Sequence, residues 1–243
     1  MRHPFFAASR PLVFAHRGGS ALAPENTIEA FDNGLRLGAD GLELDVRLSR
    51  DGSVMVLHDQ MLDRTVSLRG PIADRTADEL RRANVPALAD VLARYRDVRI
   101  IIELKINRVE LAAAAVDTVR RADAVDRVCF GSFGWRVLRA VRALEPAVAT
   151  SAAREEVRWA LYRSWCRWPV SRVPYAGYQV PEWAGRTRVV SPWFVECAHR
   201  AGLGVQVWTV DREDDAKRLL GWGVDALITD RPDIIVPICN PRR

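Results

Sequence analysis

Short apolar runs alternate along the chain with longer segments in which apolar residues recur at helical spacing. The first run, residues 12–15 (LVFA), has the length and composition of a buried strand. The segment 25–37 follows, with Ile28, Phe31 and Leu35 on one helical face and a glycine directly after it. This order of elements predicts a strand followed by a helix at the start of the chain.

The same alternation continues to the end of the chain. Strand-like runs occupy residues 12–15, 41–49, 100–106, 126–133, 147–153, 176–180, 204–210 and 225–230. Helical patterns lie between most of them, at residues 25–37, 111–122, 135–145, 154–165, 192–202 and 212–223. Alternating strands and helices form parallel sheets, and eight such units within 243 residues fit one closed barrel better than two doubly wound domains. The predicted fold class is therefore α/β, a (β/α)₈ TIM barrel.

One segment interrupts the repeat after the second strand. Residues 51–59 form another short extended run, joined to the strand through the turn signal Asp51-Gly52, and the stretch from there to Pro86 carries few strand signals. We expect a single domain spanning residues 1–243, with a small inserted subdomain contained in residues 46–99. The loops that follow the strands form the active site of TIM barrels, so polar residues at the ends of strands are the candidates for chemistry.

The charge balance gives little reason to expect a nucleic-acid partner. The chain has 36 basic and 31 acidic side chains, a net charge of +5, and all but two of the basic residues are arginine. This small excess is spread along the whole chain instead of being gathered in a basic patch, and we expect no nucleic acid to bind.

Cysteine usage and the N-terminal residues both favour a cytoplasmic protein. The four cysteines lie more than thirty positions apart and form no C-x-x-C pair, which predicts neither a zinc site nor a disulfide framework. The first residues lack an apolar run of signal-peptide length, and no run of about 18 uncharged apolar residues occurs elsewhere.

Charged residues interrupt two of the apolar strands at a spacing of two. Glu43 and Asp45 lie on the second predicted strand, and Glu103 and Lys105 lie on the third. Residues at this spacing project from the same face of a strand, so the carboxylates are expected to converge at the barrel mouth. Oxygen ligands of this kind suit Mg²⁺ or Ca²⁺. A set of structural ion pairs with arginine is the alternative, and strand spacing does not decide between the two.

Two of the four histidines fall on the same rim. His16 ends the first strand, next to Arg17, and His58 ends the extended run after the second strand. Two histidines, a metal-type cluster and an arginine make the set that phosphodiester cleavage requires: a base, an acid and cations that hold the phosphate charge. His3 lies in a terminus that we expect to be mobile, and His199 lies in a predicted helix.

At these positions the chain resembles the glycerophosphodiester phosphodiesterase family. The matching motifs are HRGG at 16–19, PENT at 24–27, GADGLELDVRLSRDGSVMVLHD at 38–59, ELK at 103–105, VWTV at 207–210 and GVDALITDRPD at 223–233. The resemblance runs from the first strand to the last in the right order. It implies a TIM barrel with a small insertion and a metal-dependent hydrolysis of glycerophosphodiesters to sn-glycerol 3-phosphate and an alcohol.

The resemblance also implies roles for particular residues. Glu43, Asp45 and Glu103 would hold the divalent cation, Mg²⁺ or Ca²⁺, and His16 and His58 would act as the general acid-base pair. Which histidine is the acid and which the base is not decided by the sequence.

Four further residues are expected to bind the substrate or its phosphate. Arg17 would contact the phosphate, and Lys105 would lie close to the phosphate or to the metal carboxylates, unless it only pairs with Glu103. Trp208 would line the pocket, with core packing as its alternative. Asn26 would hold the first loop over the site, or cap the helix that follows.

One position departs from the family pattern near Trp208. The residue after W-T-V is commonly asparagine in the family and is Asp211 here. A carboxylate near an anionic phosphate is unfavourable unless it points away or caps the next helix, so the contact made at this position is in doubt.

The segment 153–193 is the second departure. It holds seven arginines and five of the eight tryptophans: Trp159, Trp165, Trp168, Trp183 and Trp193. These residues could form a surface that lies on lipid headgroups or a groove for an acyl chain, or they could belong to a helix that packs tryptophan onto the barrel with arginine facing water.

Each interpretation of this segment implies a different substrate. A water-soluble glycerophosphodiester suits the packed helix, whereas a lysophospholipid, cleaved as by a lysophospholipase D, suits the lipid-facing surface. A third hypothesis is an inactive barrel that binds a phosphorylated ligand, against which the full set of histidines and carboxylates argues. The sequence does not predict the headgroup preference or the oligomeric state.

Overall fold

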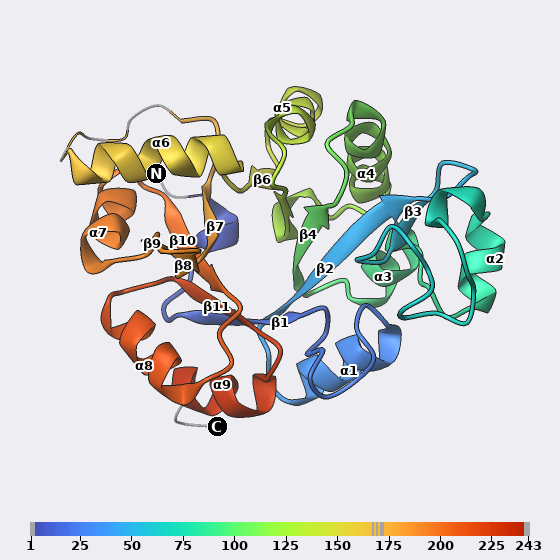
Figure 1. Cartoon of the computed structure of the whole chain (residues 1–243), viewed down its shortest axis with the longest axis horizontal. Helices are drawn as coiled ribbons and strands as arrows, with labels where there is room; N and C mark the ends of the chain where they lie inside the picture. The colour runs from blue at the N-terminus through green and yellow to red at the C-terminus, as the bar shows by residue number, and fades with distance from the viewer. Residues whose placement is uncertain (1–2, 167, 169, 171–172, 241–243) are drawn as a thin grey trace.

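The computed structural model describes residues 3–166, 168, 170 and 173–240, and within them eight parallel strands form a barrel (Figure 1). The strands are β1 (Leu12–His16), β2 (Gly41–Leu48), β4 (Arg99–Leu104), β5 (Val128–Gly131), β6 (Ala149–Thr150), β7 (Gly177–Pro181), β10 (Gly204–Trp208) and β11 (Ala226–Thr229). They are paired in the order β6-β5-β4-β2-β1-β11-β10-β7. A parallel bridge between Ser151 and Gly177 joins the first and last strands of this order, β6 and β7, and closes the ring. The predicted barrel is confirmed.

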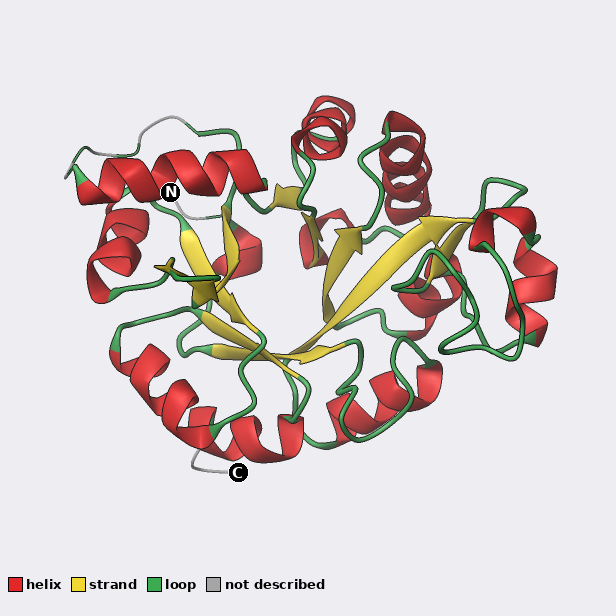
Figure 2. Ribbon diagram, in the orientation of Figure 1, coloured by secondary structure: helices red, strands yellow, loops and turns green. Residues whose placement is uncertain are grey.

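Helices cover the outside of the barrel (Figure 2). They are α1 (Ile28–Arg36), α4 (Val109–Arg121), α5 (Trp135–Leu144), α6 (Arg154–Trp165), α7 (Pro192–Arg200), α8 (Glu213–Gly221) and α9 (Pro232–Cys239). The helical patterns predicted all of these except α9, whose short apolar sequence contains Pro237 and has no polar face. In the part of the chain that the structure describes, no helix combines the length and the apolar character needed to cross a bilayer.

A short N-terminal segment closes the amino-terminal end of the barrel. The 3-10 helix η1 (Pro4–Phe6) buries Phe5 and Phe6 against the side chains that fill the barrel interior. The glycines that begin β7 and β10 make room for the Phe6 ring, since a Cβ on Gly177 would lie 2.8 Å from it. The expectation of a mobile terminus is wrong for His3, whose Nδ1 accepts a hydrogen bond from the Phe5 amide and whose Nε2 lies 3.1 Å from the Ala147 carbonyl oxygen.

The segment between β2 and β4 carries the insertion. It contains β3 (Val54–Val56), which pairs antiparallel with β2, followed by η2 (Ile72–Asp74), α2 (Ala77–Arg82) and α3 (Leu88–Arg94). Residues between Met55 and Ala87 form a separate small core, whereas α3 packs on the main core of the barrel. We retain residues 46–99 as the proposed bounds of the inserted subdomain.

A second, smaller excursion follows β7. The two-residue strands β8 (Trp183–Ala184) and β9 (Thr187–Arg188) form an antiparallel hairpin that is separate from the barrel sheet. Strands this short leave no periodic signal in a sequence, and the hairpin was not among the expected elements.

The packing of η1 predicts that Phe6 contributes strongly to stability. Phe6→Ala removes a buried ring from the barrel end and is expected to lower the free energy of unfolding by about 3–5 kcal/mol, measured by urea denaturation. The control Val109→Ala removes methyl groups from an exposed position on α4 and is expected to change it by less than about 0.5 kcal/mol. Equal, small effects of the two substitutions would show that η1 does not pack as described.

Candidate active site

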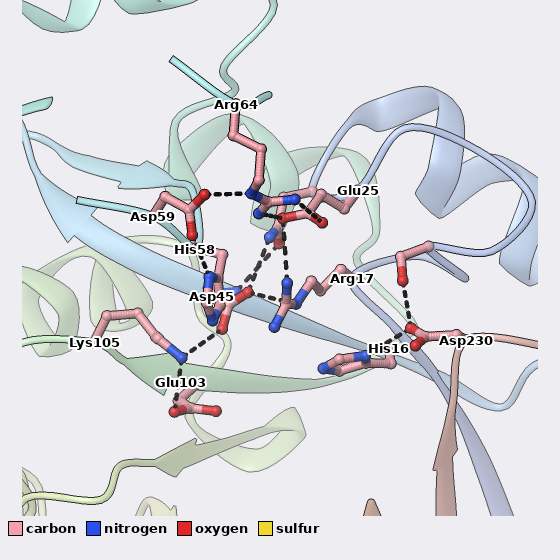
Figure 3. Close-up of polar contacts among 12 residues, drawn as sticks. His16, Arg17, Glu25, Asp45, His58, Asp59, Arg64, Glu103, Lys105 and Asp230 are labelled. Carbon is pink, nitrogen blue, oxygen red and sulfur yellow. Dashed lines mark hydrogen bonds and ion pairs between the residues drawn. The ribbon is translucent and has the colours of Figure 1, made fainter. Parts of the chain in front are cut away.

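Most of the polar residues selected from the sequence line one cavity at the carboxyl ends of the strands; Asn26 and Asp45 are buried and are not part of its lining. The cavity has a volume of about 800 Å³, and the predicted polar residues that line it are His16, Arg17, Glu43, His58, Glu103 and Lys105. Trp208 also lines it. Figure 3 shows how the charged side chains from β1, β2, β4 and the loop after β3 point toward one another.

Strand register brings the three carboxylates together. His16 on β1 is the register partner of Glu43 on β2, and Asp45 on β2 is the partner of Glu103 on β4. Glu43, Asp45 and Glu103 each offer a ligand atom within 4.8 Å of the others. Glu43 and Asp45 are buried, so their charges are removed from water and must be balanced inside the protein.

Two cations reach this carboxylate cluster. Lys105 Nζ lies 3.1 Å from Glu103 Oε1 and 3.4 Å from Asp45 Oδ1, and Arg17 Nε lies 3.1 Å from Asp45 Oδ2. Lys105 is therefore placed beside the metal-type carboxylates, one of the two positions expected for it. Burial raises the pKa of Glu43, and the neighbouring carboxylates of Asp45 and Glu103 raise it further against the opposing effect of His16.

One oxygen of the cluster lacks a hydrogen bond. Asp45 Oδ1 is buried and accepts no hydrogen bond from any residue that the structure describes; the ammonium group of Lys105 lies 3.4 Å from it. A buried carboxylate oxygen in this state is costly. The oxygen thus has a free coordination position that a hard cation could use.

A carboxylate orients the ring of His16. Its Nδ1 lies 2.7 Å from Asp230 Oδ1, while its Nε2 lies 3.7 Å from Glu43 Oε2. Burial of the ring opposes protonation, but the attraction of Glu43 and the hydrogen bond with Asp230 outweigh it and raise the pKa of His16 to about 9. Asp230 is not among the predicted site residues, although it ends the last predicted strand and polar residues at strand ends are the candidates for chemistry.

His58 is held in the same way from the inserted segment. Its Nδ1 lies 2.7 Å from Asp59 Oδ1, and its carbonyl oxygen accepts a hydrogen bond of 2.8 Å from Arg47 Nε. The amide of Leu57 donates to the Asp45 carbonyl oxygen, which ties this stretch to β2. Both histidines therefore have Nδ1 engaged by an aspartate, and both line the cavity.

The loop after β1 carries Arg17 in an uncommon backbone conformation. Arg17 has φ +51°, and its amide donates to Glu43 Oε2 at 3.1 Å. Gly18 follows at φ +89°, where a Cβ would lie 2.6 Å from the Cβ of Ala30 on α1, so only glycine fits this turn. The loop thereby presses close to α1 while Arg17 faces the carboxylates.

Asn26 contacts the carboxylate cluster and does not line the cavity. It is 2% exposed, its Nδ2 donates to Asp45 Oδ2 at 3.0 Å, and its Oδ1 accepts from the Asp45 amide at 3.2 Å. The cap of α1 is Thr27, whose hydroxyl accepts from the Ala30 amide. The helix-cap alternative for Asn26 is wrong, whereas its place among the substrate-binding residues stays a prediction; in the structure its side chain holds Asp45.

Trp208 ends β10, and Asp211 follows it in the loop before α8. The Trp208 ring contacts Phe133 edge-on, with centroids 6.0 Å apart, at the cavity wall. Asp211 Oδ1 accepts hydrogen bonds from the Thr229 hydroxyl at 3.0 Å and from the Asp230 amide at 2.8 Å. Its charge is thus engaged at the end of β11, and it does not cap α8, whose N-cap residue is Arg212.

Known proteins match this chain in sequence and in structure. The pattern that defines the glycerophosphoryl diester phosphodiesterase family matches residues 16–234. The chain belongs to this family. A glycerophosphodiester phosphodiesterase of Caldanaerobacter subterraneus subsp. tengcongensis is 30% identical over 245 residues, covering 93% of this chain and 97% of that protein.

Solved structures of phosphodiesterases share the barrel. A glycerophosphodiester phosphodiesterase from Agrobacterium tumefaciens superposes with a TM-score of 0.76 at 26% identity, covering 94% of this chain and 98% of that chain. A phosphodiesterase from Oleispira antarctica, in complex with the product sn-glycerol-3-phosphate, superposes with a TM-score of 0.75 at 27% identity, covering 94% and 96% of the two chains.

In this member of the glycerophosphoryl diester phosphodiesterase family, one arginine of the insertion connects two loops of the site (Figure 3). Arg64 forms ion pairs with Asp59, the partner of His58, and with Glu25, to which its two terminal nitrogens donate at 2.7 and 3.1 Å. Glu25 also accepts from Arg17 at 3.2 Å. Sequence reasoning missed Arg64 because no pattern marks a lone arginine in an irregular segment.

This connection predicts that Arg64 positions His58 through Asp59. The hydrogen bond from Arg64 is the main reason that the pKa of Asp59 is lowered to about 2. Arg64→Ala is expected to raise that pKa toward the ordinary value of about 3.9, measured by carbon NMR titration, and to lower kcat on a glycerophosphodiester by about tenfold. The control Arg69→Ala changes an exposed arginine in the same segment, and an equal effect there would contradict a specific role for Arg64.

Proposed function

We propose that the chain hydrolyses glycerophosphodiesters to sn-glycerol 3-phosphate and an alcohol, with a divalent cation in the carboxylate cluster. The observation that carries the proposal is the pair of aspartate-held histidines, His16 and His58, in the cavity that contains this cluster. A protein that only bound a phosphorylated ligand would need no such pair. The product complex of the Oleispira antarctica phosphodiesterase supports a small-molecule substrate of this class.

The residues present fit a hard cation. Glu43, Asp45 and Glu103 would hold Mg²⁺ or Ca²⁺ through carboxylate oxygens, and the free position on Asp45 Oδ1 suits such an ion. When bound, the cation would neutralise charge on the phosphate. Asn26 holds Asp45 in place for this role, and Lys105 and Arg17 limit the repulsion between the carboxylates.

The chain's own side chains supply the proton transfers. One histidine takes a proton from the attacking oxygen nucleophile, and the other gives a proton to the departing alcohol oxygen; each acts through Nε2, because an aspartate engages Nδ1. The bond between phosphorus and the leaving alcohol oxygen breaks, and a bond to the attacking oxygen forms. The overall reaction adds one water to the diester. Arg17, which lines the cavity, binds a phosphate oxygen.

Replacement of either histidine tests the acid-base assignment. His16→Ala and His58→Ala are each expected to lower kcat on glycerophosphocholine by about 10²–10⁴-fold, with glycerol 3-phosphate release as the readout. The control His199→Ala lies outside the cavity, on α7, and should retain near wild-type kcat. If both cavity variants stay as active as the control, the acid-base assignment is wrong.

Removal of the cation tests the carboxylate cluster. EDTA is expected to abolish hydrolysis, and Mg²⁺ or Ca²⁺ to restore it. Calorimetric titration of the chain with each ion should detect one site that Asp45→Asn loses, because that substitution removes a charge from the cluster. Asp78→Asn, at an exposed carboxylate on α2, is the matched control. Unchanged ion binding in Asp45→Asn would place the cation elsewhere.

A further inference from the structure

Helix α6 presents its large aromatic side chains to the outside. Trp159, Tyr162 and Trp165 are 69%, 47% and 59% exposed, while the buried positions of the helix are Ala160, Leu161 and Ser164. The three aromatic rings follow one another at a spacing of three residues, with centroids 6.5 and 5.5 Å apart. This arrangement is the reverse of an ordinary amphipathic helix. The alternative in which α6 packs its tryptophans onto the barrel is wrong for Trp159 and Trp165.

The cavity of the candidate active site extends to this helix. Besides the catalytic side chains, its lining includes four aromatic residues that are all exposed: Phe133, Tyr162, Trp165 and Trp183. Tyr162 and Trp165 come from α6 and Trp183 from the β8–β9 hairpin, which follows β7 along the chain. We call these four residues the aromatic arm of the cavity. The cavity thus has a charged end at the carboxylates and an apolar end at the rim.

Two arginines line the cavity together with the aromatic arm. Arg154 and Arg158 on α6 also line the cavity, and neither forms an ion pair with a carboxylate of the described residues. The Arg154 guanidinium lies 5.0 Å from the centroid of the Phe133 ring. Exposed arginines without carboxylate partners are complementary to a ligand that carries negative charge close to an apolar group.

A small glycerophosphodiester leaves the aromatic arm without a partner. Such a molecule is polar at both ends. The cavity, at about 800 Å³, lies in the upper part of the range of about 300–1,000 Å³ that is typical of pockets for drug-sized ligands. A lysophospholipid matches both ends, because its phosphodiester belongs at the carboxylates and its single acyl chain can cover the aromatic rings. The further exposed tryptophans Trp159 and Trp168, outside the cavity lining, have the amphipathic character of residues that lie at a membrane surface.

We propose that the aromatic arm receives the acyl chain of a lysophospholipid drawn from a membrane surface, which makes the chain a lysophospholipase D. This inference rests on the proposed function, because the same histidines and carboxylates cleave the diester. The bond between phosphorus and the headgroup oxygen breaks, the oxygen of water joins phosphorus, and a proton goes to the headgroup alcohol. The products are lysophosphatidic acid and the free alcohol.

A series of acyl chain lengths tests the ligand. The full chain is assayed with glycerophosphocholine and with lysophosphatidylcholines of increasing acyl length, all kept monomeric. The value of kcat/KM is expected to rise with length, by up to about fourfold for each methylene that the arm buries. A flat series, with glycerophosphocholine hydrolysed equally well, would overturn this inference and leave the proposed function intact. No hydrolysis of any of these substrates with either cation would overturn the proposed function itself.

Substitutions in the aromatic arm test the place of binding. The double variant Trp165→Ala with Trp183→Ala is expected to lower the ratio of kcat/KM on dodecanoyl lysophosphatidylcholine to that on glycerophosphocholine by about tenfold or more. Trp135→Ala, an exposed tryptophan on α5 outside the cavity lining, is the matched control and should keep the wild-type ratio. Because both substrates are measured on the same preparation, a partly unfolded variant would not change the ratio. An unchanged ratio in the double variant overturns the assignment.

Binding to vesicles tests the source of the lipid. Trp159→Ala with Trp168→Ala removes two exposed rings that are not part of the cavity lining. The wild-type chain in EDTA is expected to sediment with vesicles of phosphatidylcholine and phosphatidylglycerol, and this variant to sediment at least several-fold less. If the wild-type chain stays in the supernatant, the membrane origin of the ligand is wrong.

Discussion

Three carboxylates repel one another at the mouth of the barrel, and the other residues of the site compensate for this repulsion. Glu43, Asp45 and Glu103 converge within 4.8 Å, and two of them are buried. Strand register imposes this proximity, and an isolated cluster of this kind would oppose folding. Around it the chain places Lys105 and Arg17 as fixed counter-charges. These cations leave Asp45 Oδ1 without a hydrogen bond, and this is the oxygen that a metal ion in the cluster could use.

Most of the barrel could be predicted because its information is local. Each strand that lines the barrel lies within an apolar run, and the six predicted helices each lie within one continuous helical pattern. The elements that were not predicted are those whose sequence pattern is short or whose structure depends on residues far away in the sequence. The β8–β9 hairpin has two residues in each strand, α9 lacks a polar face, and η1 acquires its buried position only from the barrel end that it covers.

The site residues divide in the same way, into those that local sequence marks and those whose contacts lie far away in the sequence. Position at the end of an extended run selected both histidines, and spacing along a strand selected the three carboxylates. The aspartate that orients His16 was missed. The pairing of His16 with Asp230 spans 214 positions and exists only because β1 and β11 are neighbours in the closed barrel. Asn26 was assigned to the substrate because a sequence does not tell whether a polar side chain faces a cavity or, as here, the backbone and carboxylate of Asp45.

The closure of the barrel end by η1 has a consequence for synthesis of the protein. Phe5 and Phe6 are synthesised before the surfaces that bury Phe6, which include Gly177 at the start of β7 and Gly204 at the start of β10. The aromatic pair therefore lacks these partners until β7 and β10 have emerged from the ribosome. Because contacts between residues far apart in the sequence form late, this end of the barrel closes only after β10 has been made, and until then the Phe5-Phe6 pair is open to chaperones.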